Sequence, residues 1–160
     1  MKTCAAALGQ SSLELIITLS FGLMILLPIV TLAFVQVSNS NTTLATSEAA
    51  TSAEKLAAIA TQVASQGYPA RQTLLLEVPQ GVQAVYVGNL SYNGIGNEVI
   101  FVVDTNNGKS YITAYTPINI SGYLPGIQGP ATYLINVSAT KICPATRGIG
   151  APCAFVRFAS

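Results

Sequence analysis

A run of 23 uncharged residues, from Leu15 to Val37, constrains this chain more than any other feature of its sequence. A helix of that length is about 34 Å long, which is enough to cross a hydrocarbon core of about 30 Å. Fifteen of the residues are Leu, Ile, Phe or Val, and on an insertion scale they contribute about −4 to −9 kcal/mol together. The run is longer than the roughly 7–15 apolar residues of a removable signal peptide. We therefore expect a membrane-spanning helix that the mature chain retains.

One acidic residue, Glu14, stands directly before this run and is the only charged residue between Lys2 and Glu48. An acid is unusual at this place, because charges near the ends of membrane helices are normally basic side chains that reach the interface. Ser11 and Glu14 also have the spacing of a capping box, which satisfies free main-chain N–H groups at the start of a helix. The residues alone leave both interpretations open, a helix cap and a charge kept for a partner.

Gln10, Ser12 and Glu14 form a Gln-x-Ser-x-Glu pattern that resembles the class III signal motif of archaeal type IV pilin-like proteins. The resemblance implies that a prepilin-type peptidase cuts between Gly9 and Gln10, on the cytoplasmic side of a helix that is kept. It further implies that Glu14 pairs with the new α-amino group of a neighbouring subunit during assembly. Members of the family usually carry Leu four residues after the Glu, where this chain has Thr18.

Lys2 is the only basic residue before the apolar run. The positive-inside preference therefore favours an N-terminus inside the cell and a location outside it for everything after Val37. Within the run, Pro28 lacks a main-chain N–H group, so a kink is expected there, with local unwinding of the helix as the alternative.

We divide the chain into four segments. Residues 1–9 are the expected cleaved leader, and residues 10–37 form the transmembrane helix, which by the resemblance would also form a filament core. Residues 38–66 begin with a polar stretch and then continue the helix in amphipathic form, ending at Gly67-Tyr68-Pro69. Residues 67–160 are an extracellular β-domain. Apolar residues of the amphipathic part recur at spacings near three and four, at Leu44, Ala49, Leu56, Ile59, Ala60 and Val63.

From Arg71 onward the apolar pattern changes to a period of two, and Asn107-Gly108 is a strong hairpin signal. We predict an α+β fold in which the amphipathic half of the long N-terminal helix packs on a C-terminal antiparallel sheet or small sandwich, as in type IV pilins. The expected strands are Gln72–Val78, Val82–Val87, Asn97–Val103, Lys109–Thr116, Ala131–Ala139 and Ala154–Phe158.

Cys143 and Cys153 are the only cysteine pair once Cys4 is assigned to the leader, and they bracket a Gly- and Pro-rich loop. A disulfide that closes so short a loop contributes about 3 kcal/mol in the chain-entropy model. Two free thiols are the alternative, because disulfides depend on the compartment.

Four Asn-x-Ser/Thr sequons all follow the apolar run, which is the pattern expected of a surface glycoprotein. These candidate N-glycosylation sites are Asn41, Asn89, Asn119 and Asn136.

Composition argues against several classes of function. The chain has seven basic and six acidic residues, too balanced for a nucleic-acid-binding protein. It has no His, and none of the spacings of a metal site, nucleophile elbow or phosphate-binding loop, so we expect no enzyme and no cofactor. Seven tyrosines without tryptophan fit a half-buried sheet, with an adhesive surface as the alternative.

Two functions remain on these grounds. The first is a structural subunit of an extracellular type IV pilus-like filament, a helical homo-oligomer whose subunits stand in the membrane until a prepilin-type peptidase processes them. The second is a single-pass membrane-anchored surface protein or minor pilin that acts as an adhesin. Cleavage before Gln10 and the role of Glu14 distinguish them, since a permanent anchor requires neither.

Overall fold

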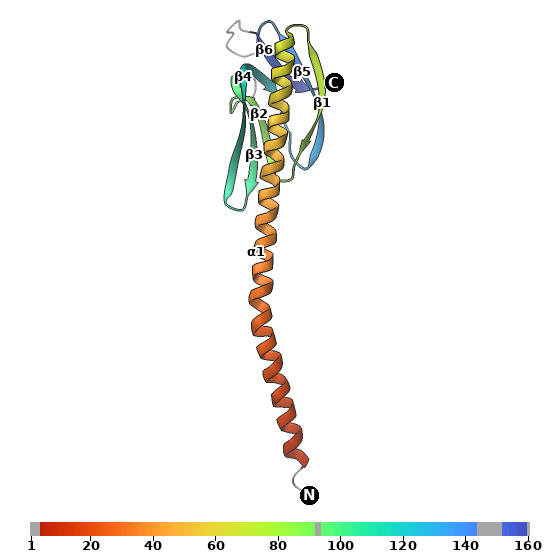
Figure 1. The fold of residues 1–160 in the computed structure, drawn as a ribbon, viewed down its shortest axis with the longest axis vertical. Coiled ribbons are helices and arrows are strands. Elements are labelled where there is room, and N and C mark those ends of the chain that lie inside the picture. Colours follow the sequence, from red (N-terminus) through yellow and green to blue (C-terminus); the bar gives the residue numbers. More distant parts are fainter. Residues whose placement is uncertain (1–3, 92–93, 144–151, 160) are drawn as a thin grey trace. The chain divides into compact units, whose positions relative to one another are not determined.

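The computed structural model describes the backbone of residues 4–91, 94–143 and 152–159, and their side chains from Ser12 onward. The chain forms two compact units, Met1–Asn41 and Thr42–Ser160, which we describe separately. One helix, α1 (Cys4–Gln66), supplies all of the described structure of the first unit and the first element of the second (Figure 1).

Helix α1 begins at Cys4, inside the expected leader and six residues before the expected start at Gln10. The polar stretch of residues 38–43 does not interrupt it, although the boundary between the two units falls within that stretch. The helix ends at Gln66 as predicted. Gly67 follows with a φ of 72°, and its N–H group donates to the carbonyl of Ala64 at 3.0 Å, a left-handed termination that glycine adopts readily.

The rest of the second unit is a six-stranded sheet with the order β1-β5-β6-β4-β3-β2. All neighbouring strands are antiparallel except β4 and β6, which pair in parallel over four residues. The sheet is therefore mixed rather than wholly antiparallel. Its strands are β1 (Arg71–Val78), β2 (Val82–Gly88), β3 (Ile95–Thr105), β4 (Gly108–Tyr123), β5 (Ala131–Thr140) and β6 (Cys153–Phe158).

Strand β4 ends at Tyr123, seven residues beyond the predicted end at Thr116. It passes through Pro117, which cannot donate a ladder hydrogen bond and is tolerated only where pairing is relaxed. The register shows such a place, since Tyr115 pairs with Glu98 and Ile120 with Gly96, and the residues between bulge away from β3. Beyond the bulge, β4 also pairs with β6.

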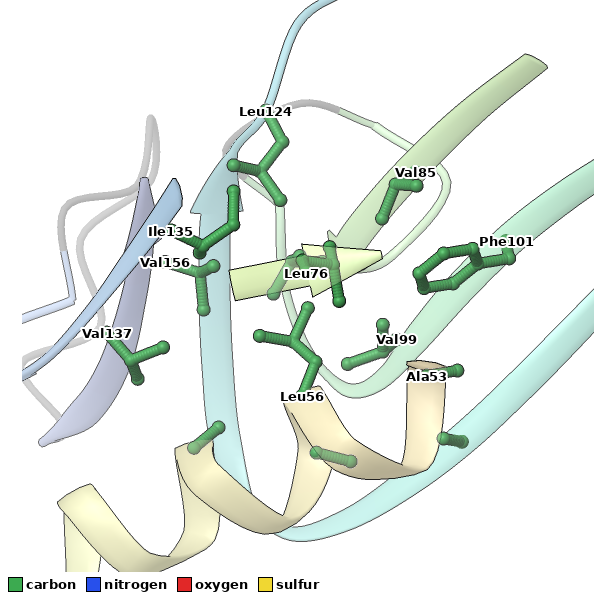
Figure 2. Close-up of a cluster of buried hydrophobic side chains, with 14 of the residues drawn as sticks. Ala53, Leu56, Leu76, Val85, Val99, Phe101, Leu124, Ile135, Val137 and Val156 are labelled. Carbon is green, nitrogen blue, oxygen red and sulfur yellow. The ribbon is translucent and has the colours of Figure 1, made fainter. Parts of the chain in front are cut away.

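The hydrophobic core of the second unit lies between one face of the sheet and the second half of α1 (Figure 2). The helix contributes mainly alanines, whose small side chains let the helix axis approach the sheet closely, with Leu56 as the largest buried side chain from this helix. The buried helix positions are Ala49, Ala53, Leu56, Ala57, Ala60 and Val63, and those of the sheet include Leu76, Val85, Val99, Phe101, Ile135, Val137 and Val156.

The prediction that Leu44 belongs to this core face was wrong. Its side chain is 57% exposed, while Ala45 packs partly buried against the core. Ala45 precedes the buried Ala49 by one helical turn, and the next residue around the helix lies about 100° away. Leu44 is therefore directed off the face that meets the sheet.

The predicted hairpin at Asn107-Gly108 is present between β3 and β4. Gly108 has a φ of 110°, which side-chain-bearing residues rarely adopt. The hydroxyl of Thr105 donates to the carbonyl of Gly108 at 2.6 Å and closes the turn.

Candidate functional site

Residues 13–37 of α1 form a helical surface that is apolar on every side. Their large hydrophobic side chains are between 49% and 74% exposed. The helix is long and apolar enough to span a membrane, with a mean hydropathy of 2.5 in its most apolar window and none of that window buried. An apolar surface of this extent on a water-soluble monomer would be an aggregation liability. It requires lipid or protein around it.

Glu14 stands on this otherwise uncharged surface as an exposed side chain. Thr18 lies one turn further along, and its hydroxyl donates to the carbonyls of Glu14 and Leu15 at 3.0 Å each. A threonine that bonds back to its own helix hides its polar atom from an apolar environment. This geometry explains how a polar residue can stand on the apolar helix at position 18.

The residues of the expected cleavage site, Gly9 and Gln10, lie within the helical backbone of α1. The side chain of Gln10 is outside the described part of the structure, as is Lys2. Ser12 is exposed. Cleavage before Gln10 therefore stays a prediction.

Pro28 lies inside α1, and the helix continues on both sides of it. Its missing N–H group leaves the carbonyl one turn before it without a helical donor. Nearby, the hydroxyl of Thr31 donates to the carbonyl of Leu27 at 2.8 Å. The kink at Pro28 stays a prediction.

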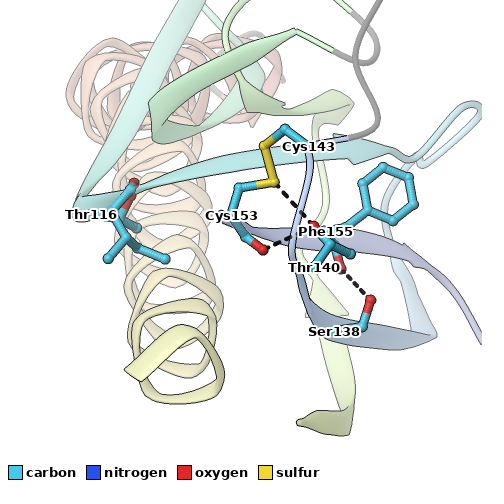
Figure 3. Close-up of a disulfide and its surroundings, with 7 residues drawn as sticks. Thr116, Ser138, Thr140, Cys143, Cys153 and Phe155 are labelled. Carbon is cyan, nitrogen blue, oxygen red and sulfur yellow. Dashed lines mark hydrogen bonds between the residues drawn. A yellow bond between two sulfur atoms is a disulfide. The ribbon is translucent and has the colours of Figure 1, made fainter. Parts of the chain in front are cut away.

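The disulfide between Cys143 and Cys153 is present, which confirms that pairing (Figure 3). Both cysteines are buried, and their Cα atoms are 5.5 Å apart, within the usual range for a disulfide. The bond joins the segment after β5 to the first residue of β6. The hydroxyl of Thr140 reinforces this junction by donating to the carbonyl of Cys153 at 3.1 Å.

The four sequons occupy different environments. Asn41 is exposed on α1, whereas Asn89, Asn119 and Asn136 are half-buried. The Oδ1 atom of Asn89 accepts hydrogen bonds from the N–H and hydroxyl groups of Ser91, at 2.9 and 2.6 Å. Glycosylation at all four stays a prediction.

The other two sequons contain buried polar atoms. The hydroxyl of Ser121, the third residue of the Asn119 sequon, is buried without a partner among the described residues, and so is Oδ1 of Asn136. Of the four asparagines, Asn41 is thus the one whose side chain the folded chain exposes most openly.

Two carboxylates that are distant in the sequence line the same groove in the folded chain. Glu48 of α1 and Glu77 of β1 line one open groove of about 610 Å³ at the end of the sheet where β1 ends and β5 begins. Glu48 and Glu77 are 29 positions apart in the sequence, so no local spacing rule predicts that they lie close together. They share a groove because β1 runs back along the helix in the antiparallel direction. No group of three metal-ligating side chains occurs among the residues that the structure describes.

Comparisons with protein-family models, curated proteins and solved structures found no match for this chain. The architecture itself is pilin-like, with a long apolar N-terminal helix whose second half packs on a C-terminal, mostly antiparallel sheet.

Proposed function

We propose that this chain is the structural subunit of an extracellular type IV pilus-like filament. The observation that carries the proposal is the helical surface of residues 13–37, apolar all round and exposed, ahead of a folded disulfide-bonded unit. Packing many such helices side by side buries their apolar surfaces against one another, as a bilayer does before assembly. The pilin-like architecture supports this use of the helix.

Processing by a prepilin-type peptidase gives Glu14 a role. Cleavage before Gln10 creates a positive α-amino group four residues ahead of Glu14. An acid and an amine are each costly alone among apolar helices, and the cost falls when they pair. The pair sets the axial register between neighbouring subunits, because Glu14 is the one charged side chain on the helical surface of residues 13–37.

Peptide mass spectrometry on sheared extracellular material tests the proposal. Chains that begin at Gln10, either as glutamine or in the cyclised form that N-terminal glutamine adopts, are the expected result. If only intact chains that begin at Met1 are found, and only in the membrane fraction, the proposal fails.

One observation favours a second candidate, a membrane-anchored surface protein or minor pilin that acts as an adhesin. Tyr115 is 80% exposed and Tyr111 is 57% exposed, and both project from the face of β4 opposite to the core. Packing of the sheet does not require these two tyrosine side chains to be exposed, whereas aromatic side chains are common in binding surfaces. Loss of surface attachment in Tyr115→Ser, with filament yield unchanged, would support adhesion by this face.

A further inference from the structure

The groove that Glu48 and Glu77 line combines apolar side chains with polar ones, and its polar side chains are mainly hydrogen-bond acceptors. Its hydroxyl-bearing residues are Ser47, Thr51, Ser52 and Thr132. Three of these hydroxyls already donate their hydrogen to main-chain carbonyls: Ser47 to Leu44 at 2.8 Å, Thr51 to Ser47 at 3.0 Å and Ser52 to Glu77 at 2.7 Å. Those three oxygens therefore retain only lone pairs for a further partner. We call this the acceptor groove.

No lysine or arginine lines the acceptor groove in the described part of the chain, and two prolines among its lining residues have no N–H group. The polar groups of this site are carboxylates and hydroxyl oxygens whose hydrogens are already donated to carbonyls. They favour a partner that donates hydrogen bonds and accepts none. Guanidinium fits best, since it carries five N–H donors and no acceptor and can bind a carboxylate through two parallel hydrogen bonds.

The same unit presents such a group at its opposite end. Arg71 opens β1 and Glu77 lies near the end of that strand, with both side chains exposed. Six residue steps separate them, about 20 Å along the strand. Because the positions differ by an even number, both lie on the sheet face away from the core. Strand β1 is also an edge strand, so nothing in the described sheet covers its outer side.

Lys141 adds a second cation at the Arg71 end. It follows β5, whose register places Ser138 opposite Arg71. Its ammonium lies 5.1 Å from the centre of the Tyr68 ring, a cation–π contact that holds the positive charge beside the end of α1. We call Arg71 and Lys141 the basic end.

The other three exposed cations in the described ranges are less suited to the groove. Lys109 lies opposite Asp104 across the β3–β4 hairpin, and Lys55 follows Glu54 on the helix. Arg157 lies within the sheet, opposite Asn136 of β5. Among the residues that the structure describes, only the basic end combines two cations, a terminal position and the absence of an acidic register partner.

We propose that the acceptor groove of one copy binds the basic end of a second copy, with Arg71 beside Glu77. The two surfaces differ and lie at opposite ends of one unit, so the contact is heterologous and repeats along an open chain. Exposed Leu75 and Leu134, which face each other across β1 and β5, lie between the two ends and add apolar contact. This inference rests on the proposed filament function and names a contact between its subunits.

A charge-swap experiment in full-length chains tests it, with sheared filament yield per cell as the readout. Arg71→Glu and Glu77→Arg should each lower the yield at least tenfold. The double variant R71E/E77R should recover at least half of the wild-type yield, because it exchanges the two signs. Arg157→Glu, a reversal on the same sheet face away from both ends, is the matched control and should retain wild-type yield.

The amount of disulfide-bonded subunit in the membrane fraction shows whether each variant folds. Normal filament yield from both single variants would overturn the inference, and so would failure of the folded double variant to recover. Filaments that dissociate in a chelator but ignore Arg71→Glu would show that the groove holds a metal ion instead, which also overturns it. If wild-type chains make no filament at all, the proposed function fails and this inference falls with it.

Discussion

The hydroxyl of Ser52 donates a 2.7 Å hydrogen bond to the main-chain carbonyl of Glu77, and so joins the middle of α1 to the edge strand β1. Strand β1 pairs on only one side, with β5. The bond gives one carbonyl near the end of this edge strand a partner from the helix. It also fixes the distance between two elements that line the acceptor groove.

Replacing Ser52 with Ala should lower the free energy of unfolding of the second unit by about 0.5–1 kcal/mol, the lower part of the range for an exposed hydrogen bond. Amide hydrogen exchange near Glu77 should accelerate. Ser47→Ala is the matched control, because that hydroxyl bonds only within its own helix, to Leu44. Equal exchange rates in the two variants would contradict a tie between helix and strand.

Leu56→Ala should lower the free energy of unfolding by about 2–5 kcal/mol, because it leaves a cavity between the helix and the sheet. Its side chain is fully buried, whereas that of Leu44 on the same helix is 57% exposed. Leu44→Ala should therefore change stability by less than about 0.5 kcal/mol. Denaturant unfolding of the detergent-solubilised chain measures both, and similar losses would refute the placement of these residues.

Removing the disulfide with Cys143→Ser and Cys153→Ser should cost about 3 kcal/mol, since the bond closes a short loop and attaches the first residue of β6. The wild-type chain in a reducing agent should unfold at the same denaturant concentration as this double variant. A reducing agent should have no effect on the variant itself. A wild-type chain whose unfolding is insensitive to reduction would contradict the expectation.

Glu14→Gln should leave membrane insertion intact and reduce sheared filaments to background, because the amide keeps the shape but cannot form an ion pair with the new N-terminus. Immunoblots of membrane and sheared fractions measure both quantities. Glu54→Gln, which removes an exposed acid from the second half of the helix, should assemble normally. Wild-type filament yield from Glu14→Gln would leave the helix cap as the explanation of this residue.

Local patterns predicted most of the secondary structure. The period-two pattern predicted the strand Ala131–Ala139, in which Ile135 and Val137 are buried, and Asn107-Gly108 predicted the hairpin. These features depend on neighbours in the chain, through strand periodicity and turn conformation. The end of α1 at Gln66 was also predicted from the sequence, because a glycine follows it.

The predictions were wrong where segments distant in the sequence determine the end of a strand or the buried face of the helix. The predicted strand ended at Thr116, yet β4 continues past Pro117 because β6, from the far end of the sequence, supplies a second partner there. Leu44 appeared to face the core because its spacing fits the helical period, but the contact with the sheet starts only at Ala45. Neither partner is visible in the local sequence.

The features of the candidate site likewise fall into those predicted from the sequence and those that depend on the tertiary structure. The sequence by itself determined the membrane-length apolar helix, the single acid at Glu14 and the cysteine pair, because length, hydropathy and loop spacing act along the chain. Only the tertiary structure decided that Glu48 and Glu77 share a groove and that Arg71 stands at the other end of the strand. That arrangement depends on which way the edge strand returns along the helix, and core packing across the whole second unit sets that direction.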